Sequence, residues 1–435
     1  MSVELRSMYC REFFMLRVSL VVAVAFALAS PAYAEDWTEF RGSGGQGHSS
    51  AKNLPAEFGP TTNVAWKVEV PGSGWSSPIV LKKRIYLTAA VPQGDDGADG
   101  QALRVFCLDA DDGSTIWNVQ AFEQSNGRGT RIHHKNSHAS STPITDGKHL
   151  YVHFGTHGTA CLTLEGKIVW KTTELVYAPN HGNGGSPVLV DDLLIVSCDG
   201  SDIDYIAALD RSSGQLRWKT SRPQVPNPRK FSFSTPLVIE IDGKKQLISA
   251  GTDIVAAFEP ATGKEIWRVT YDGYSVVPRP VFGHGMVYIC TGWSPPKLLA
   301  IRPTGTGDVT DSHVKWASRR GVPNTSSTLL VGDELYFISD RGIVSCLDAK
   351  SGNSHWTKRL GLSNNDGFSA SPVYADGKIY FQSEQGDAIV IKPGLKYEEL
   401  ARNQFPEERT LASYAIADSA LFIRTDKNLY RIQQR

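Results

Sequence analysis

The chain has 435 residues, with 45 basic and 45 acidic side chains, so its formal net charge is zero. A balanced charge provides no electrostatic footprint for nucleic acid or for an anionic membrane surface, and we expect neither as a partner. Of the six cysteines, Cys10 lies in a segment predicted below to be removed, and the odd number that remains argues against a disulfide framework.

Residues 1–34 are typical of a secretory signal peptide. Met15 and Arg17 precede an apolar run from Val18 to Ala29, and small residues follow up to Ala34. We therefore expect cleavage after Ala34 and export to the periplasm or the extracellular space. The apolar run is shorter than the roughly 20 residues that a membrane span requires, so the mature chain is expected to have no span. Translation starts at Met1 and at Met15 are both compatible with this pattern.

Residues 35–62 form a predicted N-terminal arm between the signal peptide and the first strand. The segment is polar and rich in glycine, and it contains Trp37 and Phe40. We expect an extended arm that is anchored by these two aromatic rings. A phosphate-binding glycine loop is the alternative, and it is disfavoured because no helix-forming segment follows.

Six copies of one pattern follow, each with a short apolar strand, a polar turn and a tryptophan near the start of a second strand. Glycine and tryptophan stand four residues apart in five copies, at Gly113 and Trp117, Gly166 and Trp170, Gly214 and Trp218, Gly263 and Trp267, and Gly352 and Trp356. A degraded copy ends at Trp316. Tryptophans 40 to 53 residues apart match propeller blades of about 40–50 residues. Glycine permits a positive φ in the turn, and we expect each indole to be an apolar wedge between neighbouring sheets.

A second marker is Ser or Thr before Pro, or a degraded form of it, followed by an apolar strand, a turn and another strand. It occurs eight times, at Ser77–Pro78, Thr142–Pro143, Ser186–Pro187, Thr235–Pro236, Arg279–Pro280, Ser327–Thr328, Ser371–Pro372 and Ser413–Tyr414. Turn residues such as Asp146–Gly147 come after the first of the two strands. One unit is therefore four strands, and we expect eight units.

The last unit, residues 410–435, ends after its third strand, and the missing strand stands at the other end of the chain. Residues 63–70 contain Trp66 and the alternation of a fourth strand, and they precede the first Ser-Pro marker. Pairing this strand with the last unit closes a ring and removes its open edges. We therefore predict an all-β fold, a single eight-bladed β-propeller of four-stranded antiparallel blades over residues 63–435, present as a monomer.

The Ala-Leu-Asp-x-x-x-Gly-x-x-x-Trp pattern, complete at Ala208–Trp218, resembles the repeat of the pyrroloquinoline quinone (PQQ) propeller superfamily. The resemblance covers most of the mature chain and implies a fold rather than an activity. One branch, the quinoprotein dehydrogenases, holds PQQ and calcium on the propeller axis and often has an adjacent cysteine pair, which this chain lacks. The other branch is the BamB-type propeller of outer-membrane assembly, a scaffold that binds no quinone.

Chain length, export and the missing cysteine pair favour a secreted PQQ-like propeller of the BamB type, although no lipoprotein cysteine follows Ala34. This resemblance implies a non-catalytic scaffold that needs no cofactor and binds envelope proteins or peptides. Two alternatives stay open. They are a PQQ- and calcium-dependent dehydrogenase of alcohols or sugars, and a metal-binding enzyme that uses a histidine-rich face.

In a propeller, the connections that precede the Ser-Pro markers converge near the axis, and here they are polar. The candidate ligand-binding residues on this face are His133, His134, His138, His181, Asn183, Arg279, Asn365 and Asp366. The four histidines are candidate ligands of a transition metal, but their spacing matches no established motif, so loop histidines are the plainer interpretation. Asn183 and Asp366 offer the oxygen ligands that calcium prefers, or ordinary turn chemistry. Arg279 is a candidate partner for an anionic ligand, with a structural salt bridge as the alternative.

Overall fold

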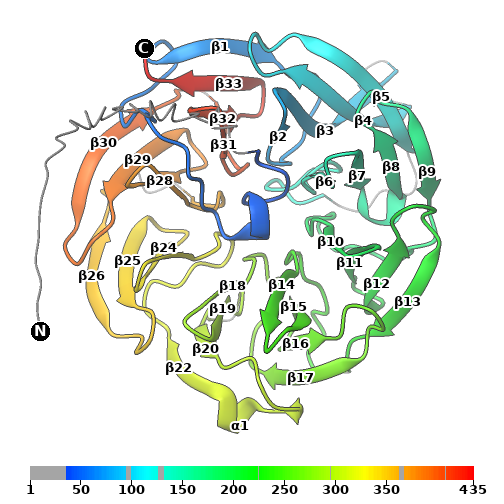
Figure 1. Ribbon diagram of the computed structural model, residues 1–435, viewed down its shortest axis with the longest axis vertical. Coiled ribbons are helices and arrows are strands. Elements are labelled where there is room, and N and C mark those ends of the chain that lie inside the picture. The colour runs from blue at the N-terminus through cyan, green and yellow to red at the C-terminus, as the bar shows by residue number, and fades with distance from the viewer. Residues whose placement is uncertain are drawn as a thin grey trace, which may run out of the picture. The chain divides into compact units, whose positions relative to one another are not determined.

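A computed structural model describes residues 36–94, 99–125, 132–223, 225–293, 295–361, 367–406 and 408–435. Eight separate sheets, antiparallel except for one short parallel pair, surround a common axis in these residues (Figure 1). The predicted eight-bladed all-β propeller is therefore confirmed. Residues 1–35, which include the predicted signal peptide, lie outside the described part.

Apart from the outermost strand of blade 8, each blade takes its strands in chain order from the axis to the rim. The blades are, in order, β2 (Ile79–Leu81), β3 (Arg84–Gln93), β4 (Gly100–Asp109) and β5 (Thr115–Gln124); β6 (Ile144–Thr145), β7 (His149–His153), β8 (Thr159–Thr163) and β9 (Ile168–Thr172); β10 (Val188–Val190), β11 (Leu193–Asp199), β12 (Asp204–Asp210) and β13 (Leu216–Ser221); and β14 (Leu237–Ile241), β15 (Lys244–Gly251), β16 (Ile254–Phe258) and β17 (Glu265–Thr270).

The second half of the ring repeats this plan. Its blades are β18 (Val281–Gly283), β19 (Met286–Cys290), β20 (Leu298–Ile301) and β22 (Val314–Ser318); β23 (Leu329–Val331), β24 (Glu334–Ile338), β25 (Ile343–Asp348) and β26 (Ser354–Arg359); β27 (Val373–Ala375), β28 (Lys378–Gln382), β29 (Asp387–Lys392) and β30 (Glu398–Gln404); and β31 (Ala415–Ala417), β32 (Ala420–Arg424), β33 (Asn428–Gln433) and β1 (Val64–Glu69). Short helical turns are η1 (Ser43–Gly45), η3 (Gly155–His157) and α1 (Thr310–His313).

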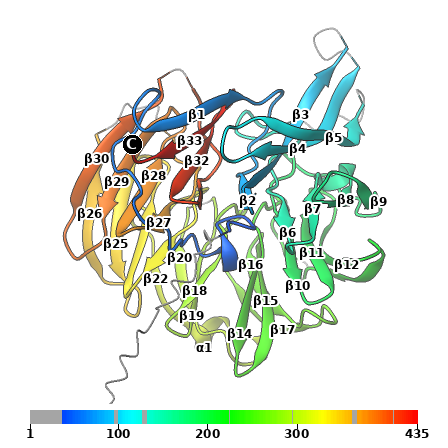
Figure 2. The ribbon, with the colours of Figure 1, turned by 45° about the horizontal axis from the view of Figure 1, so that its top comes forward.

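The N-terminal strand closes the ring, as predicted. Strand β1 pairs antiparallel with β33, with Trp66 opposite Arg431, and becomes the outermost strand of blade 8. Figure 2 shows the first and last parts of the chain side by side at this blade. The Trp66 indole donates a 2.9 Å hydrogen bond to the carbonyl of Ala110 in blade 1. The first and last described strands are thereby joined in one blade, so blade 8 is not left one strand short.

The repeat tryptophans connect neighbouring blades. The Trp117 indole, for example, donates to the Leu164 carbonyl of the next blade at 2.9 Å and packs on Gly166, whose φ is +86°. A Cβ at Gly166 would lie 2.8 Å from that indole, so the turn requires glycine both for its backbone and for the close approach. The same bond recurs from Trp66, Trp170, Trp218, Trp316 and Trp356. These six indoles therefore contact the next blade, each through a directional hydrogen bond.

Blade 4 departs from the four-strand prediction. A fifth short strand, β21 (Gly307–Asp308), pairs parallel with β17 at its outer edge. This strand belongs to the long connection before Trp316, where the repeat is degraded, and the connection crosses to the preceding blade. Trp267 is consequently fully buried and donates to the Gln246 side chain at 2.9 Å instead of to a backbone carbonyl of blade 5.

The five cysteines of the described chain are all buried and unpaired. Burial raises the pKa of Cys107, Cys161 and Cys346 to about 12, so these thiols stay protonated and behave as small apolar groups. Among the described residues, no helix has the length and hydropathy of a membrane span.

Candidate functional site

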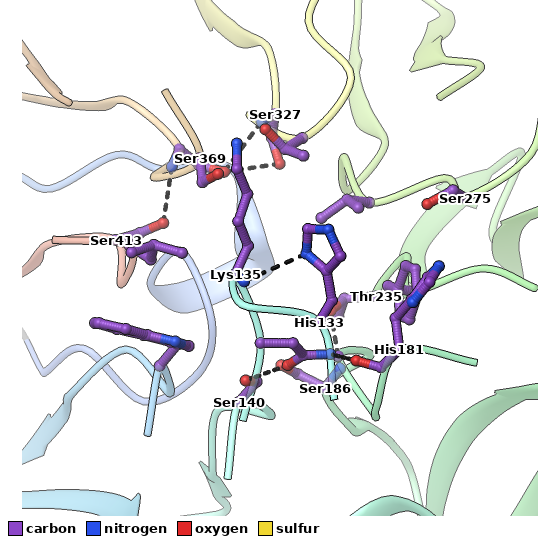
Figure 3. A pocket seen from close by; sticks show the side chains of 18 of the residues that line it. His133, Lys135, Ser140, His181, Ser186, Thr235, Ser275, Ser327, Ser369 and Ser413 are labelled. Atoms are coloured by element: carbon purple, nitrogen blue, oxygen red, sulfur yellow. Dashed lines mark hydrogen bonds between the residues drawn. The ribbon is translucent and has the colours of Figure 1, made fainter. Parts of the chain in front are cut away.

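A cavity of about 450 Å³, called the axial cavity below, lies on the propeller axis and is lined by residues of all eight blades. One face of the propeller is formed by the connections that precede the Ser-Pro markers and by the turns between the second and third strands of the blades. The cavity opens on this face, because Trp293 and Asp340, which lie in two of these turns, line it. Figure 3 shows the side chains that point into it.

Seven Ser and Thr side chains of the marker positions form a ring around this cavity. They are Ser77, Thr142, Ser186, Thr235, Ser327, Ser371 and Ser413, called the hydroxyl ring below. Each hydroxyl oxygen accepts a hydrogen bond of 2.9 to 3.1 Å from the backbone N–H of the marker residue in the preceding blade. The bond from Ser413 to Ser77 joins blade 8 to blade 1, so the ring closes together with the fold.

Arg279 takes the eighth place in the ring, and its guanidinium is used by the arm. It donates to Glu39 Oε2 at 2.9 Å, to the Phe40 carbonyl at 2.6 Å and to the Pro236 carbonyl at 3.1 Å. The structural salt bridge, one of the two alternatives for this residue, is therefore what the structure shows. The backbone N–H of Arg279 still donates to Ser327, so the ring is interrupted only between blades 4 and 5.

The arm closes the axis at the end opposite the cavity mouth. Its backbone pairs with Val80 through Trp37 and with Tyr374 through Gly47 and Ser49, near the ends of first strands. Phe40, from the same arm, reaches the cavity lining. In Figure 1 the dark blue arm crosses from the rim to the middle of the ring. The predicted anchoring role of Trp37, which is 1% exposed, is thus visible in the structure.

Glycines let the arm pass close to buried cations. A Cβ at Gly45 would lie 2.0 Å from Nη1 of Arg279, and one at Gly47 would lie 2.7 Å from Nη2 of Arg41. Arg41 is fully buried, and burial together with the nearby Arg279 lowers its pKa to about 9. The glycine-rich composition of the arm is explained by this packing.

The walls of the cavity combine aromatic and polar side chains. Trp75, Phe231, Phe233, Tyr274 and Trp293 supply the aromatic surface. Lys135 ion-pairs with Glu384 at 2.7 Å, and Ser369 donates to the same carboxylate. Asp340 accepts from the backbone and side chain of Asn324 at 2.9 and 3.1 Å. Most of the charged groups of the wall are therefore held by neighbours.

The structure brings two of the four candidate histidines together in the cavity. His133 and His181 both line it, with ring centroids 5.2 Å apart, on two connections whose backbones are hydrogen bonded to each other. Burial, with His134, His181 and Lys135 nearby, lowers the pKa of His133. The ring of His134 lies 4.2 Å from that of His133 and is tilted by 39° to it, but His134 is exposed to solvent. His138 lies apart, beside His157 at 5.2 Å.

Within the described ranges, no group of three His, Cys, Asp or Glu side chains is arranged to hold a metal ion. Asn183, the candidate calcium ligand, is engaged in hydrogen bonds, because Tyr177 donates to its Oδ1 at 2.7 Å and its Nδ2 donates to Ser141 at 2.5 Å. Asn365 and Asp366 fall outside the described residues. The donor set of the described cavity does not fit a PQQ and calcium pair, because the lining carboxylate Asp340 is engaged by Asn324 and the neighbouring Glu384 by Lys135.

The hydroxyl ring is the feature that sequence reasoning missed. The Ser-Pro markers predict where each unit begins, and their recurring hydroxyl groups are the signal for a shared axial surface. A polar side chain repeated at the start of each innermost strand has to face the axis, because these strands surround it.

The comparisons with known proteins agree with this architecture. Residues 58–200 and 202–434 match the family model described as outer membrane protein assembly factor BamB. The search of curated proteins returned no match. Among solved structures, BamB from Moraxella catarrhalis is 15% identical, with 85% of this chain and 96% of that chain covered and a TM-score of 0.62. Sqt1 from Saccharomyces cerevisiae is 9% identical, with 89% and 100% covered and a TM-score of 0.60.

The quinohemoprotein alcohol dehydrogenase from Comamonas testosteroni is 12% identical, with 91% of this chain and 80% of that chain covered and a TM-score of 0.52. Likenesses at these identities describe the fold, which scaffolds and dehydrogenases share. The family match extends over nearly all of the described residues. The chain therefore belongs to the BamB-like family of PQQ-repeat β-propellers.

Proposed function

We propose that this protein is an exported, non-catalytic binding propeller that captures a segment of an envelope protein or peptide in the axial cavity. The observation that carries the proposal is the construction of the cavity, which combines an aromatic wall with a ring of buried hydroxyl groups. Concave sites with apolar walls and a few convergent polar groups are the usual form of binding sites. A volume of about 450 Å³ is suited to one or two side chains of a partner.

The polar wall favours binding over catalysis. Among the wall residues, Lys135 is paired with Glu384 and Asp340 is held by Asn324. A general base has to be within hydrogen-bond reach of the proton it removes, and a nucleophile has to be placed beside such a base. The described cavity groups are instead bonded to one another in a fixed frame, which is the arrangement of a preformed binding surface.

Site-specific photocrosslinking in the native envelope tests this proposal. A photoreactive phenylalanine analogue replaces Trp293, which is 49% exposed at the cavity mouth. The matched control places the same analogue at Leu395, which is 60% exposed in a turn between third and fourth strands, on the opposite face. We expect a small, reproducible set of crosslinked proteins from position 293, and none of them from position 395.

A second variant connects the crosslinks to the cavity itself. Trp75→Ala removes an aromatic wall residue that comes from a different blade than Trp293. We expect it to reduce the crosslink yield at position 293 without changing the amount of protein. Equal crosslinks from both faces, or crosslinks that do not respond to Trp75→Ala, would contradict a cavity-based binding function.

A further inference from the structure

The hydroxyl ring carries hydrogen-bond donors for which the described residues supply no acceptor. Each ring oxygen is occupied as an acceptor by the N–H of the preceding blade. Of the seven hydroxyls, only Ser371 has an acceptor for its own proton among the described atoms, the Ser327 oxygen at 3.0 Å. The O–H groups of the other six are available to the cavity that these residues line, and the six are Ser77, Thr142, Ser186, Thr235, Ser327 and Ser413.

These donors are buried, and a buried donor without an acceptor costs more free energy than an exposed one. Every member of the ring is at most 4% exposed. A serine or threonine hydroxyl has one proton to donate, and its rotation is limited here because its oxygen already accepts a bond from a fixed direction. Six protons from different blades are therefore available to one volume on the axis. A ligand that matches them has several acceptor oxygens and no donors, as ionised carboxylates and phosphates do.

Buried positive charge lies close to the same end of the cavity. Arg41 donates to the carbonyls of Gln46 and Thr328, next to ring residue Ser327, and none of the carboxylates in the described ranges pairs with it. Arg424 donates to the carbonyl and hydroxyl of Ser76, next to ring residue Ser77, again with only neutral partners described. Arg279 has Glu39 as its counter-ion. Two buried guanidinium groups thus remain without a described counter-ion beside the ring.

We infer that the hydroxyl ring is an oxyanion site, which holds a carboxylate or a phosphate group at the closed end of the axial cavity. The inference rests on the proposed function, because it assigns the carboxylate or phosphate group to the partner segment that the cavity captures. The ring supplies hydroxyl donors, the buried arginines supply the compensating charge, and the aromatic wall above contacts the rest of the ligand. Asp340 lies on this wall, and Glu384 pairs with the wall residue Lys135, so these carboxylates favour a ligand whose negative charge is confined to one end.

Titrations of the full-length mature protein test the oxyanion site. Inorganic phosphate and succinate are the probes, with sodium chloride at equal ionic strength as the reference, and binding is followed by calorimetry and by the fluorescence of Trp75 and Trp293. We expect saturable binding of one or both probes and a rise of the melting temperature that chloride does not produce. Tighter binding of phosphate identifies a phosphoryl ligand, and tighter binding of succinate identifies a carboxylate.

Ring variants connect that binding to the hydroxyl groups. Thr235→Val removes one donor at nearly constant shape, and we expect it to weaken binding about ten-fold, as for a lost hydrogen bond to a charged group. Thr235→Ser keeps the donor and should keep the affinity. The matched control is Ser234→Ala, which removes an inter-blade bond of 2.8 Å to the Pro278 carbonyl from a residue outside the cavity lining. Ser413→Ala, in blade 8, serves as a second ring variant if Thr235→Val does not fold.

Two results would overturn the inference. One is a wild-type protein that binds neither phosphate nor succinate better than chloride. The other is binding that both ring variants leave unchanged, or that Ser234→Ala weakens as much as they do. Crosslinks at position 293 without anion binding would remove only the oxyanion site, whereas anion binding without crosslinks would remove only the proposed partner.

Discussion

Trp66→Ala tests whether the closing strand determines the stability of the whole ring. The indole of Trp66 packs against Gly113 of blade 1 and against Phe422, with ring centroids 6.1 Å apart. A buried tryptophan removes roughly 200 Å² from water, which corresponds to about 5 kcal/mol at 25 cal/mol per Å². Trp66 is only partly buried, so we expect a loss of about 3 kcal/mol in the free energy of unfolding, at the lower end of values for aromatic truncation.

The lost hydrogen bond adds little to this figure. The Ala110 carbonyl that accepts from Trp66 also accepts from Arg431 at 2.6 Å, so the substitution leaves it with a partner. Urea unfolding followed by circular dichroism measures the change. Trp293→Ala is the control, since Trp293 is 49% exposed and belongs to no repeat, and we expect its cost to stay below about 0.5 kcal/mol. If both substitutions cost the same, closure through β1 does not stabilise the ring in the way the structure indicates.

Three further predictions concern the arm, a buried histidine and the cofactor. Deleting residues 36–60 should leave a closed monomeric ring, whereas deleting 36–70 removes β1 and should produce aggregation, and size-exclusion chromatography distinguishes the two; equal behaviour would contradict the closure. Burial lowers the pKa of His153 to about 4, below its unfolded value of about 6.5, so the unfolded state binds the proton more readily and stability falls as the pH drops from 6.5 toward 4. Between pH 7 and pH 4.5, the free energy of unfolding of His153→Asn should therefore fall by about 2–3 kcal/mol less than that of the wild type, as measured by thermal melts. The same pH dependence of stability in both proteins would refute this. PQQ with calcium should leave the melting temperature unchanged and support no dye reduction with alcohols or sugars, because Asp340 of the lining and the neighbouring Glu384 are already engaged; a rise in melting temperature would restore the dehydrogenase alternative.

Local periodicity was sufficient to predict the fold. The spacing of Gly113 and Trp117 and its recurrence along the chain define strand, turn and strand within about a dozen residues, and such local patterns are legible without knowledge of distant contacts. The closing strand could also be predicted, because the last unit lacked a strand and residues 63–70 had the right alternation. The extra strand β21 could not, since it arises where the repeat is degraded and the chain crosses to a neighbouring blade.

The candidate site was decided by contacts that no local pattern contains. The sequence places polar residues on the axial connections, but only the tertiary structure brings His133 to His181 and leaves His138 apart. Arg279 was identified as an axial residue, and its partner Glu39 stands 240 residues away in the arm. The hydroxyl ring depends on bonds between residues 42 to 336 positions apart, from Ser371 to Ser413 and from Ser413 to Ser77. Periodicity determines which side chains recur, whereas the closure of eight blades around one axis determines that these side chains meet.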